Sequence, residues 1–201
     1  EGRRSYMTEK KRILIPYVDA GSGHKAFAAS IQWFLENKRP SWEVRLFDPI
    51  KEFDIPKIER MLVTNWKRLL AVPSIVTEFL LEFEPDFIMC THWGVVTIMD
   101  IARSRINRDI PIRYIFTELG GAYSPVKCGA DTYYALGSGA ADDLVRLGIH
   151  ETSIRRVNFV TAPRLKLRAE PKIEARKRLG IDPHEITVLL CLVGEGLGPV
   201  M

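Results

Sequence analysis

The strongest constraint on the fold is an alternation of short apolar runs with segments of helical spacing. The apolar runs predict strands over 12–18, 42–48, 86–91, 112–117, 131–136, 154–160 and 186–193. Apolar residues at helical spacing predict helices over 24–37, 56–82 with a break at Pro73, 94–106, 139–148 and 170–180. Strands that alternate with helices pair in parallel through crossovers, so the sequence predicts an α/β fold with a doubly wound, mostly parallel sheet.

The chain divides near its C-terminal end. Residues 161–171 contain two prolines and several basic residues without an apolar period, and we interpret them as a linker. We therefore expect one domain over residues 1–163. Residues 164–201 would hold the linker, a basic helix and the first strand and loop of a second domain that is cut off.

Composition narrows the possible partners. The chain is 46% hydrophobic and 27% charged, with a net charge of +4 and a pI near 9.0, which suits an anionic ligand or an anionic membrane surface. Nucleic acid is not an expected partner, because the basic residues cluster at 3–12 and 164–178, where aromatic residues are sparse. No apolar run is long enough to predict a transmembrane helix, and the N-terminal segment lacks the apolar core of a secretory signal.

Cysteine and histidine usage gives no sign of a metal centre. The three cysteines lie far apart without a CxxC pair, which favours a reducing compartment and predicts neither a disulfide nor a zinc site. The four histidines are scattered, and no HxxxH or HExxH pattern occurs. No GxSxG nucleophile elbow is present either, and we expect no metal and no cofactor.

The segment DAGSGHK, residues 19–25, joins the first predicted strand to the first predicted helix. Glycines allow a backbone to approach a phosphate or hydroxyl closely, and a helix N-terminus favours an anion. Lys25 adds positive charge, and His24 adds a group that can take a proton near neutral pH. The helix dipole disfavours imidazolium, so we expect it to keep His24 neutral and able to act as a base. The alternative is that Gly21 and Gly23 only make a tight turn and that His24 caps the helix.

Three further loops follow predicted strands. Glu118 would lie at the same edge of the sheet as His24 and could orient it, although in isolation a solvated loop glutamate is the favoured interpretation. His92 and Trp93 suit a sugar or a lipid headgroup because an indole offers a flat apolar face, or they are a capping histidine and a tryptophan at the edge of the core. The glycine turn 194–198 is a weak candidate for a phosphate loop.

At these residues the sequence resembles the monogalactosyldiacylglycerol synthases and the related processive diacylglycerol glucosyltransferases, which are GT-B glycosyltransferases. The resemblance spans nearly the whole chain, and its most specific elements are the small-residue loop before His24 and the terminal GEGLGP. The segments that carry it, in the family's order, are 13–31, 84–93, 111–120, 133–157, 174–182 and 188–200.

The resemblance implies two Rossmann-like domains, of which the N-terminal one takes a lipid acceptor and touches the membrane, while the C-terminal one holds a UDP-sugar. This chain resembles the first of them, the linker and the opening of the second. The family's histidine that acts on the acceptor hydroxyl maps onto His24, and our hypothesis adds Glu118 as a catalytic residue that orients His24 or the acceptor. The hypothesis also gives an acceptor site of Gly21, Ser22, Gly23, Lys25, His92 and Trp93. The resemblance implies contacts to the donor diphosphate from the terminal loop with Gly194, Glu195, Gly196 and Gly198.

The chain also departs from the family pattern. Thr117-Glu118 stands where the family usually has Thr-Asp, and the segment GGAYSPV after it lacks the family's His and Trp. The segment FVTAPRL replaces a Gly-x-Pro motif before the linker, and the loop reads Gly-Ser-Gly-His rather than Gly-Gly-Gly-His. These differences concern the acceptor, and they leave a diverged or inactive member of the family as a possible interpretation.

Our first hypothesis is the acceptor-binding half of a glycosyltransferase that moves a sugar from a UDP-sugar to a diacylglycerol-type lipid. We expect a cytoplasmic protein that associates peripherally with an anionic membrane, and a chain that is inactive without the rest of its donor domain. The alternative is a non-catalytic α/β module that binds a phosphate-bearing ligand or an anionic membrane. A sugar-nucleotide epimerase on the same fold is a third and weaker option.

Overall fold

The computed structural model describes residues 10–19, 22–53, 72–117, 128–158 and 170–188. The chain forms two compact units, Glu1–Thr161 and Ala162–Met201. The division of the chain into domains at residue 163 stays a prediction about the larger protein. Within the described residues, no helix is both long enough and apolar enough to cross a membrane.

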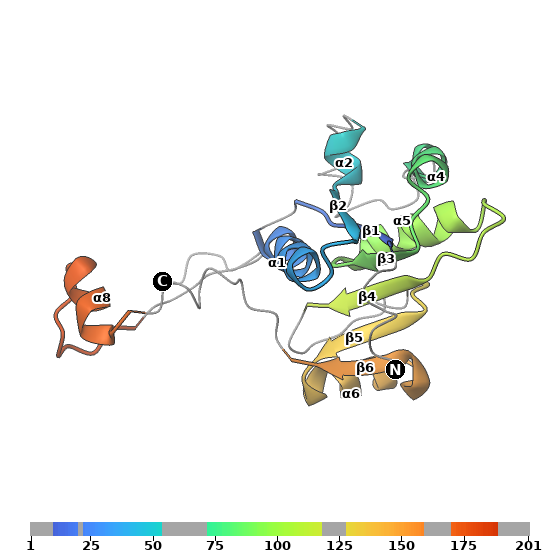
Figure 1. The fold of residues 1–201 in the computed structure, drawn as a ribbon. Coiled ribbons are helices and arrows are strands. Elements are labelled where there is room, and N and C mark those ends of the chain that lie inside the picture. Colours follow the sequence, from blue (N-terminus) through green and yellow to red (C-terminus); the bar gives the residue numbers. More distant parts are fainter. Residues whose placement is uncertain (1–9, 20–21, 54–71, 118–127, 159–169, 189–201) are drawn as a thin grey trace, which may run out of the picture. The chain divides into compact units, whose positions relative to one another are not determined.

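The first unit is built on a six-stranded sheet in which every pair of neighbours is parallel, in the order β2-β1-β3-β4-β5-β6 (Figure 1). The predicted strands are therefore present, each slightly shorter than its apolar run. Their bounds are β1 Arg12–Pro16, β2 Glu43–Phe47, β3 Phe87–Cys90, β4 Ile112–Phe116, β5 Thr132–Leu136 and β6 Ile154–Val157. The α/β class and the parallel sheet are confirmed.

Helices join the strands. They are α1 Ser22–Lys38, α2 Pro49–Glu52, α4 Val72–Phe83, α5 Trp93–Arg103 and α6 Ser138–Arg146, with a short 3-10 turn, η4, at Glu151–Ser153. Two differences from the sequence prediction are informative. Helix α1 begins at Ser22, two residues earlier than predicted, which puts Ser22 and Gly23 inside its first turn. The four-residue α2 was not predicted, because its start depends on Asp48, whose side chain accepts the backbone N–H groups of Ile50 and Lys51.

The core lies on both faces of the sheet. Side chains that alternate along β1 illustrate this: Ile13 and Ile15 pack with Ala28 and Ile31 of α1, whereas Leu14 packs in the larger cluster that α4, α5 and α6 cover. Leu14, Ile13 and Ile15 are fully buried. A strand that is apolar on both faces is typical of a parallel sheet covered on both sides.

The strand order reverses direction between β1 and β3. From β1 the chain moves outward to β2, then returns past β1 to β3 and continues through β4, β5 and β6. In open α/β sheets, ligands bind outside the carboxyl ends of the strands at such a reversal. The loops that follow β1 and β3 lie at this position, and they carry His24 and His92.

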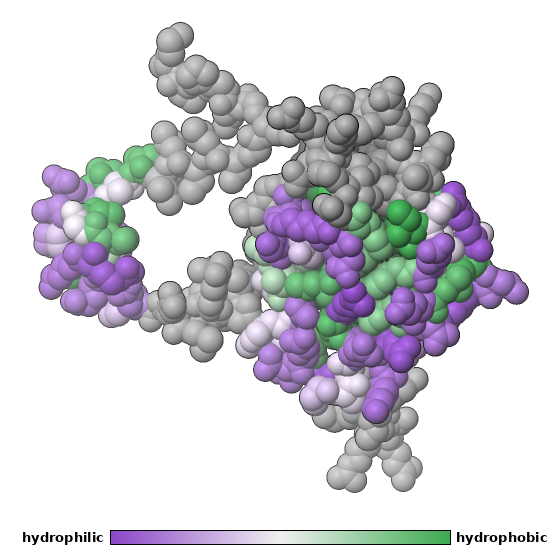
Figure 2. Space-filling view, turned by 90° about the horizontal axis from the view of Figure 1, so that it is seen from above, coloured by the Kyte–Doolittle hydropathy of each residue, from purple (hydrophilic) through white to green (hydrophobic). Residues whose placement is uncertain are grey.

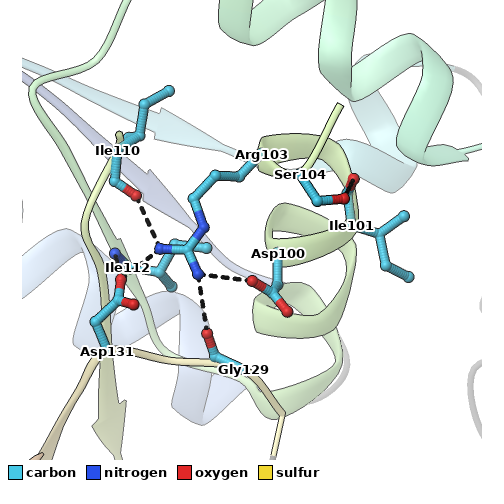
Figure 3. A network of polar contacts seen from close by, with 8 residues as sticks. All are labelled: Asp100, Ile101, Arg103, Ser104, Ile110, Ile112, Gly129 and Asp131. Carbon is cyan, nitrogen blue, oxygen red and sulfur yellow. Dashed lines mark hydrogen bonds and ion pairs between the residues drawn. The ribbon is translucent and has the colours of Figure 1, made fainter. Parts of the chain in front are cut away.

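The opposite, amino edge of the sheet holds a network of polar contacts around Arg103, the last residue of α5 (Figure 3). Its guanidinium donates to the carboxylates of Asp131 at 2.5 Å and Asp100 at 2.7 Å, and to the carbonyl oxygens of Ile110 at 3.1 Å and Gly129 at 3.4 Å. Asp131 also accepts the backbone N–H of Ile112 at 2.6 Å. The network thus joins the end of α5 to the loops that lead into β4 and β5.

The second unit contains the predicted basic helix, α8, over Lys172–Arg178. Arg176 donates to the carbonyl oxygens of Asp182 and Glu185, both at 2.7 Å, which fastens the segment after the helix back onto it. The strand predicted over 186–193 is absent from residues 186–188, and its other residues lie outside the described part of the chain.

Candidate active site at the carboxyl edge of the sheet

Several of the predicted site residues meet where β1 and β3 end, at the reversal of strand order. His24 comes from the first turn of α1, and His92 and Trp93 come from the junction of β3 with α5. The centroids of the two imidazole rings are 4.8 Å apart, with the rings nearly perpendicular, and the rings of His92 and Trp93 stack at 5.4 Å. Residues that are 68 positions apart in sequence thus form one cluster.

The remaining predicted residues are distributed as follows. Gly23 and Lys25 are exposed in the first turn of α1, and Ser22 begins this helix. Gly21, Glu118 and the loop with Gly194, Glu195, Gly196 and Gly198 lie outside the described residues. Their proposed contacts to acceptor and donor therefore stay predictions.

Thr91, which immediately precedes His92, fastens His24 in place. Its carbonyl oxygen lies 2.7 Å from Nδ1 of His24, and its hydroxyl donates to the backbone carbonyl of His24 at 3.2 Å. Its own N–H donates to the carbonyl of Pro16 at 3.4 Å. Thr91 is fully buried, so these bonds link the first turn of α1 to the ends of β1 and β3.

The contact with Thr91 fixes the tautomer of His24. A carbonyl oxygen can only accept, so Nδ1 of His24 must carry the proton that it donates. In the neutral ring Nε2 is then the unprotonated nitrogen. No hydrogen bond to Nε2 occurs within the described part of the chain. Nε2 of the neutral ring is therefore a hydrogen-bond acceptor, and the side chain of His24 contacts Thr91 instead of capping α1.

His92 has the opposite tautomer. It is the N-cap of α5, and its Nδ1 accepts the backbone N–H of Gly94 at 3.1 Å. A nitrogen that accepts is unprotonated, so in the neutral ring Nε2 carries the proton. The capping role that the sequence left open for His92 is thus observed, and it leaves the Nε2–H of the ring as a donor.

Both histidines are neutral at physiological pH. Burial lowers the pKa of His24 below its usual value, and the hydrogen bond to the Thr91 carbonyl opposes this only in part. Burial, together with the neighbouring His24, lowers the pKa of His92 to about 4. The sequence predicted a neutral His24 on account of the helix dipole, but the main cause in the structure is burial.

Charged residues lie on the β2 side of the same edge. Asp19, just after β1, accepts Lys25 of α1 at 3.3 Å and also pairs with Lys51 of α2. The hydrogen bond from Lys51 is the main cause that lowers the pKa of Asp19, so this carboxylate stays ionised. Two lysines thus pair with one carboxylate on this side of the edge.

Sequence comparison finds similarity to monogalactosyldiacylglycerol synthases. No family model matches the chain. The chain is 26% identical to the chloroplastic monogalactosyldiacylglycerol synthase of Spinacia oleracea, and the match covers 94% of this chain and 42% of that protein. It is 24% identical to monogalactosyldiacylglycerol synthase 1 of Arabidopsis thaliana, over the same 94% and 42%. The chain thus spans less than half the length of these curated relatives.

Solved structures share the fold. The lipopolysaccharide outer core galactosyltransferase WaaB matches with a TM-score of 0.53 and 17% identity, over 73% of this chain and 44% of that one. HepE of Anabaena in complex with UDP-glucose matches with a TM-score of 0.57 and 16% identity, over 85% and 50%. UDP-N-acetylglucosamine 2-epimerase of Rickettsia bellii also scores 0.57, at 12% identity, over 87% and 52%. At these identities the likeness concerns the fold.

The fold class is therefore the Rossmann-like sheet that forms the N-terminal half of a GT-B fold. Within that class, the predicted resemblance to the monogalactosyldiacylglycerol synthases is confirmed over 94% of the chain.

Sequence reasoning found both histidines but missed two neighbours. Thr91 was not predicted because it acts mainly through its backbone carbonyl, which no residue pattern reveals. Lys51 was not predicted because its ion pair with Asp19 depends on the short helix α2, which was itself not predicted. Among the described residues, no group of three or more His, Cys, Asp or Glu side chains lies together in a way that could hold a metal ion.

Proposed function

We propose that the chain is the acceptor-side half of a glycosyltransferase that moves a sugar from a UDP-sugar to a diacylglycerol-type lipid. The observation that carries the proposal is His24. Thr91 holds it at the reversal of strand order with Nε2 unprotonated and its pKa lowered. Such a group can take the proton of an acceptor hydroxyl as the oxygen attacks the anomeric carbon of the sugar.

The similar sequences and structures support the proposed lipid acceptor and the proposed UDP-sugar donor. The sequence relatives are named monogalactosyldiacylglycerol synthases, which supports a diacylglycerol acceptor. HepE, which shares the fold, has been solved with UDP and with UDP-glucose, which supports a UDP-sugar donor. The glycine loop 194–198 is the segment that we propose to contact the donor diphosphate. We propose that Lys25 and Trp93 contact the acceptor.

The direct test is UDP release by the full-length protein. With UDP-galactose or UDP-glucose and dispersed diacylglycerol, we expect UDP and a glycosyl-diacylglycerol in equal amounts. Residues 1–201 alone should release none, because a site between two domains lacks its donor side. Sustained transfer by residues 1–201 would contradict the half-site proposal, and no transfer by the full-length protein with either sugar would contradict the function.

A sugar-nucleotide epimerase is the second candidate, because the fold matches that of a UDP-N-acetylglucosamine 2-epimerase with the same TM-score as HepE. The same assay separates the two. An epimerase converts its UDP-sugar without any acceptor, whereas a transferase needs the lipid. We favour the transferase because the sequence relatives are synthases.

We also propose that the protein works at an anionic membrane surface, on the cytoplasmic side. Large apolar side chains are exposed on two helices, Trp33 and Phe34 on α1 and Leu81 on α4. Figure 2 shows apolar side chains interleaved with hydrophilic ones on one face of the molecule. The net charge of +4 would add attraction to anionic lipid.

This membrane proposal predicts weak, salt-sensitive binding to vesicles. Each basic residue near an anionic bilayer contributes about 1 kcal/mol, and salt screens this within a Debye length. Co-sedimentation with vesicles that contain phosphatidylglycerol should fall when sodium chloride is raised from 50 to about 500 mM. Equal binding to neutral phosphatidylcholine vesicles, unaffected by salt, would contradict the proposed attraction between basic residues and anionic lipid.

A further inference from the structure

We propose that His92 is a second functional histidine, whose Nε2–H holds the acceptor hydroxyl while Nε2 of His24 takes its proton. This inference rests on the proposed function and extends it from one residue to a pair. It also assigns a chemical class to the reacting group, which is a neutral alcohol.

The pair depends on the two opposite tautomers. Nδ1 of each ring is used by the fold, because His24 donates to the Thr91 carbonyl and His92 accepts from the Gly94 N–H. The remaining nitrogens are then complementary, a lone pair on His24 and an N–H on His92. The same two backbone contacts that hold the rings therefore also decide which ring accepts and which donates.

The spacing of the rings fits one bound oxygen. Two hydrogen bonds of about 2.8 Å each can join two groups that are up to about 5.6 Å apart through a single oxygen atom. The ring centroids of His24 and His92 are 4.8 Å apart, and the rings are set edge to face at 88°. This is a distance between ring centres and not between the two Nε2 atoms, and rings this close are compatible with one oxygen that contacts both. Trp93 stacks on His92 and limits the tilt of its ring. A single hydroxyl is the group that matches this donor and acceptor.

The chemistry of the pair restricts the acceptor. A hydroxyl can donate to His24 and accept from His92 at once, whereas a carboxylate has no proton to give and an ammonium has no lone pair to offer. In the transfer step the O–H bond of the alcohol breaks and its proton goes to Nε2 of His24. The alcohol oxygen forms the bond to the anomeric carbon. The bond from that carbon to the diphosphate breaks, and its electron pair leaves with UDP.

The substitution His92→Asn separates this role from capping. The side-chain oxygen of Asn can take the place of Nδ1, and Asn is among the best N-cap residues, so the first turn of α5 stays capped. The shorter side chain does not reach the position of Nε2, so the donor is lost. We expect the melting temperature to change little and kcat of the full-length enzyme to fall about tenfold or more.

His150 provides a matched control. It is also an N-cap histidine, of the short turn η4, where its Nδ1 accepts the N–H of Thr152 at 3.4 Å, and it is exposed. His150→Asn makes the same chemical change at a cap outside the site. It should leave both kcat and the melting temperature unchanged. Full activity of the His92→Asn enzyme, or an equal loss in both variants, would overturn the proposal.

A measurement on the unsubstituted protein tests the pair without any assay of activity. Long-range nitrogen-15 correlations of the histidine rings should show the proton on Nδ1 of His24 and on Nε2 of His92. The reverse assignment at either ring would overturn the pair whether or not sugar is transferred. If these tautomers are found but the protein transfers no sugar, the proposed function fails while the complementary pair of nitrogens stands.

Discussion

The two edges of the same sheet use polar side chains in opposite ways. At the amino edge, the guanidinium of Arg103 donates hydrogen bonds to two carboxylates and two backbone carbonyls (Figure 3). Only 17% of the Arg103 side chain is exposed. At the carboxyl edge, one ring nitrogen of His24 and one of His92 are hydrogen-bonded to the backbone, and the other nitrogen of each ring has no hydrogen bond to any described residue. We call the amino edge closed, because its arginine is bonded to other parts of the protein, and the carboxyl edge open, because each histidine has a ring nitrogen that is not bonded to a described residue.

This difference indicates what each edge is for. A cluster in which both terminal nitrogens of the guanidinium donate to carboxylates and backbone carbonyls can hold loops together. Neutral rings with one nitrogen left can exchange hydrogen bonds or protons with a bound group. The reversal of strand order lies at the open edge, where α/β sheets bind ligands. Substitutions at the two edges should therefore differ in whether they lower activity or stability.

The largest effect is expected from His24→Ala in the full-length enzyme. Loss of a general base lowers kcat by roughly 10²–10⁴-fold. Stability should fall by only about 1 kcal/mol, because one hydrogen bond to Thr91 is lost. Steady-state kinetics and thermal melting of the same preparation measure both. Near-normal kcat with a clearly lowered melting temperature would show that His24 is only structural.

At the amino edge, Arg103→Met should have the reverse effect. It leaves Asp100 and Asp131 without their ion-pair partner, and their side chains are 38% and 47% exposed. We expect a loss of roughly 2–3 kcal/mol of unfolding free energy, below the range for fully buried pairs, with kcat unchanged at temperatures where the protein is folded. Urea denaturation measures this loss.

Arg105→Met is the control for this substitution. Arg105 lies two residues further along the chain, and its guanidinium donates to the hydroxyl of Ser74 at an exposed position. It should cost less than about 1 kcal/mol. Equal losses in the two variants would show that the Arg103 network has no special role at the amino edge.

The free energy of unfolding should fall in a defined range of acid pH because of the two histidines at the open edge. His92 has a pKa of about 4 in the folded state against 6.5 for an ordinary histidine, and that of His24 is lowered as well. Between these values the unfolded chain binds protons that the folded chain does not, so stability falls as the pH falls from 6.5 towards 4. The contribution of His92 is at most about 3 kcal/mol, since one pH unit is worth about 1.36 kcal/mol.

Urea midpoints at pH 7, 5.5 and 4.5 measure this dependence, and the His92→Asn variant should lose part of it. A stability that is level between pH 7 and 4.5 would show that the histidines are not held neutral. The proposed activity should likewise fall on the acid side, as His24 takes up a proton. Protonation of Asp19, whose pKa is lowered below 3.8, lies outside this window.

The sequence predicted the strands because each is a short apolar run between charged or small residues, and a parallel sheet covered on both faces needs such runs. It predicted His24 because this residue follows a glycine turn at the start of a helix, and it predicted His92 because a His–Trp pair follows another strand. It could not predict Thr91 or the Arg103 network. Their contacts involve backbone carbonyl oxygens of residues such as Ile110 and Gly129, and every residue carries such an acceptor whatever its side chain.

The smallest expected effect is a difference in stability loss between substitutions of two glycines, one at each end of β5. Gly129, before the strand, has φ +89°, and Gly137, after it, has φ +87°. A side chain at either is strained by the backbone alone, which costs roughly 1 kcal/mol. They differ in their surroundings. A Cβ at Gly129 would lie 2.2 Å from a carboxylate oxygen of Asp100, whereas a Cβ at Gly137 would meet nothing within 4 Å.

Gly129→Ala should therefore be the more costly substitution. Asp100 can move away only by disturbing its 2.7 Å ion pair with Arg103, so the closed edge resists the new methyl group. We expect Gly137→Ala to cost about 1 kcal/mol and Gly129→Ala about 1 kcal/mol more, measured by urea denaturation. In an Arg103→Met background Asp100 is released, and the extra cost of Gly129→Ala should shrink. An unchanged difference between the two glycines in that background would mean that Asp100 is not held by Arg103 and that the amino edge is less closed than its hydrogen bonds indicate.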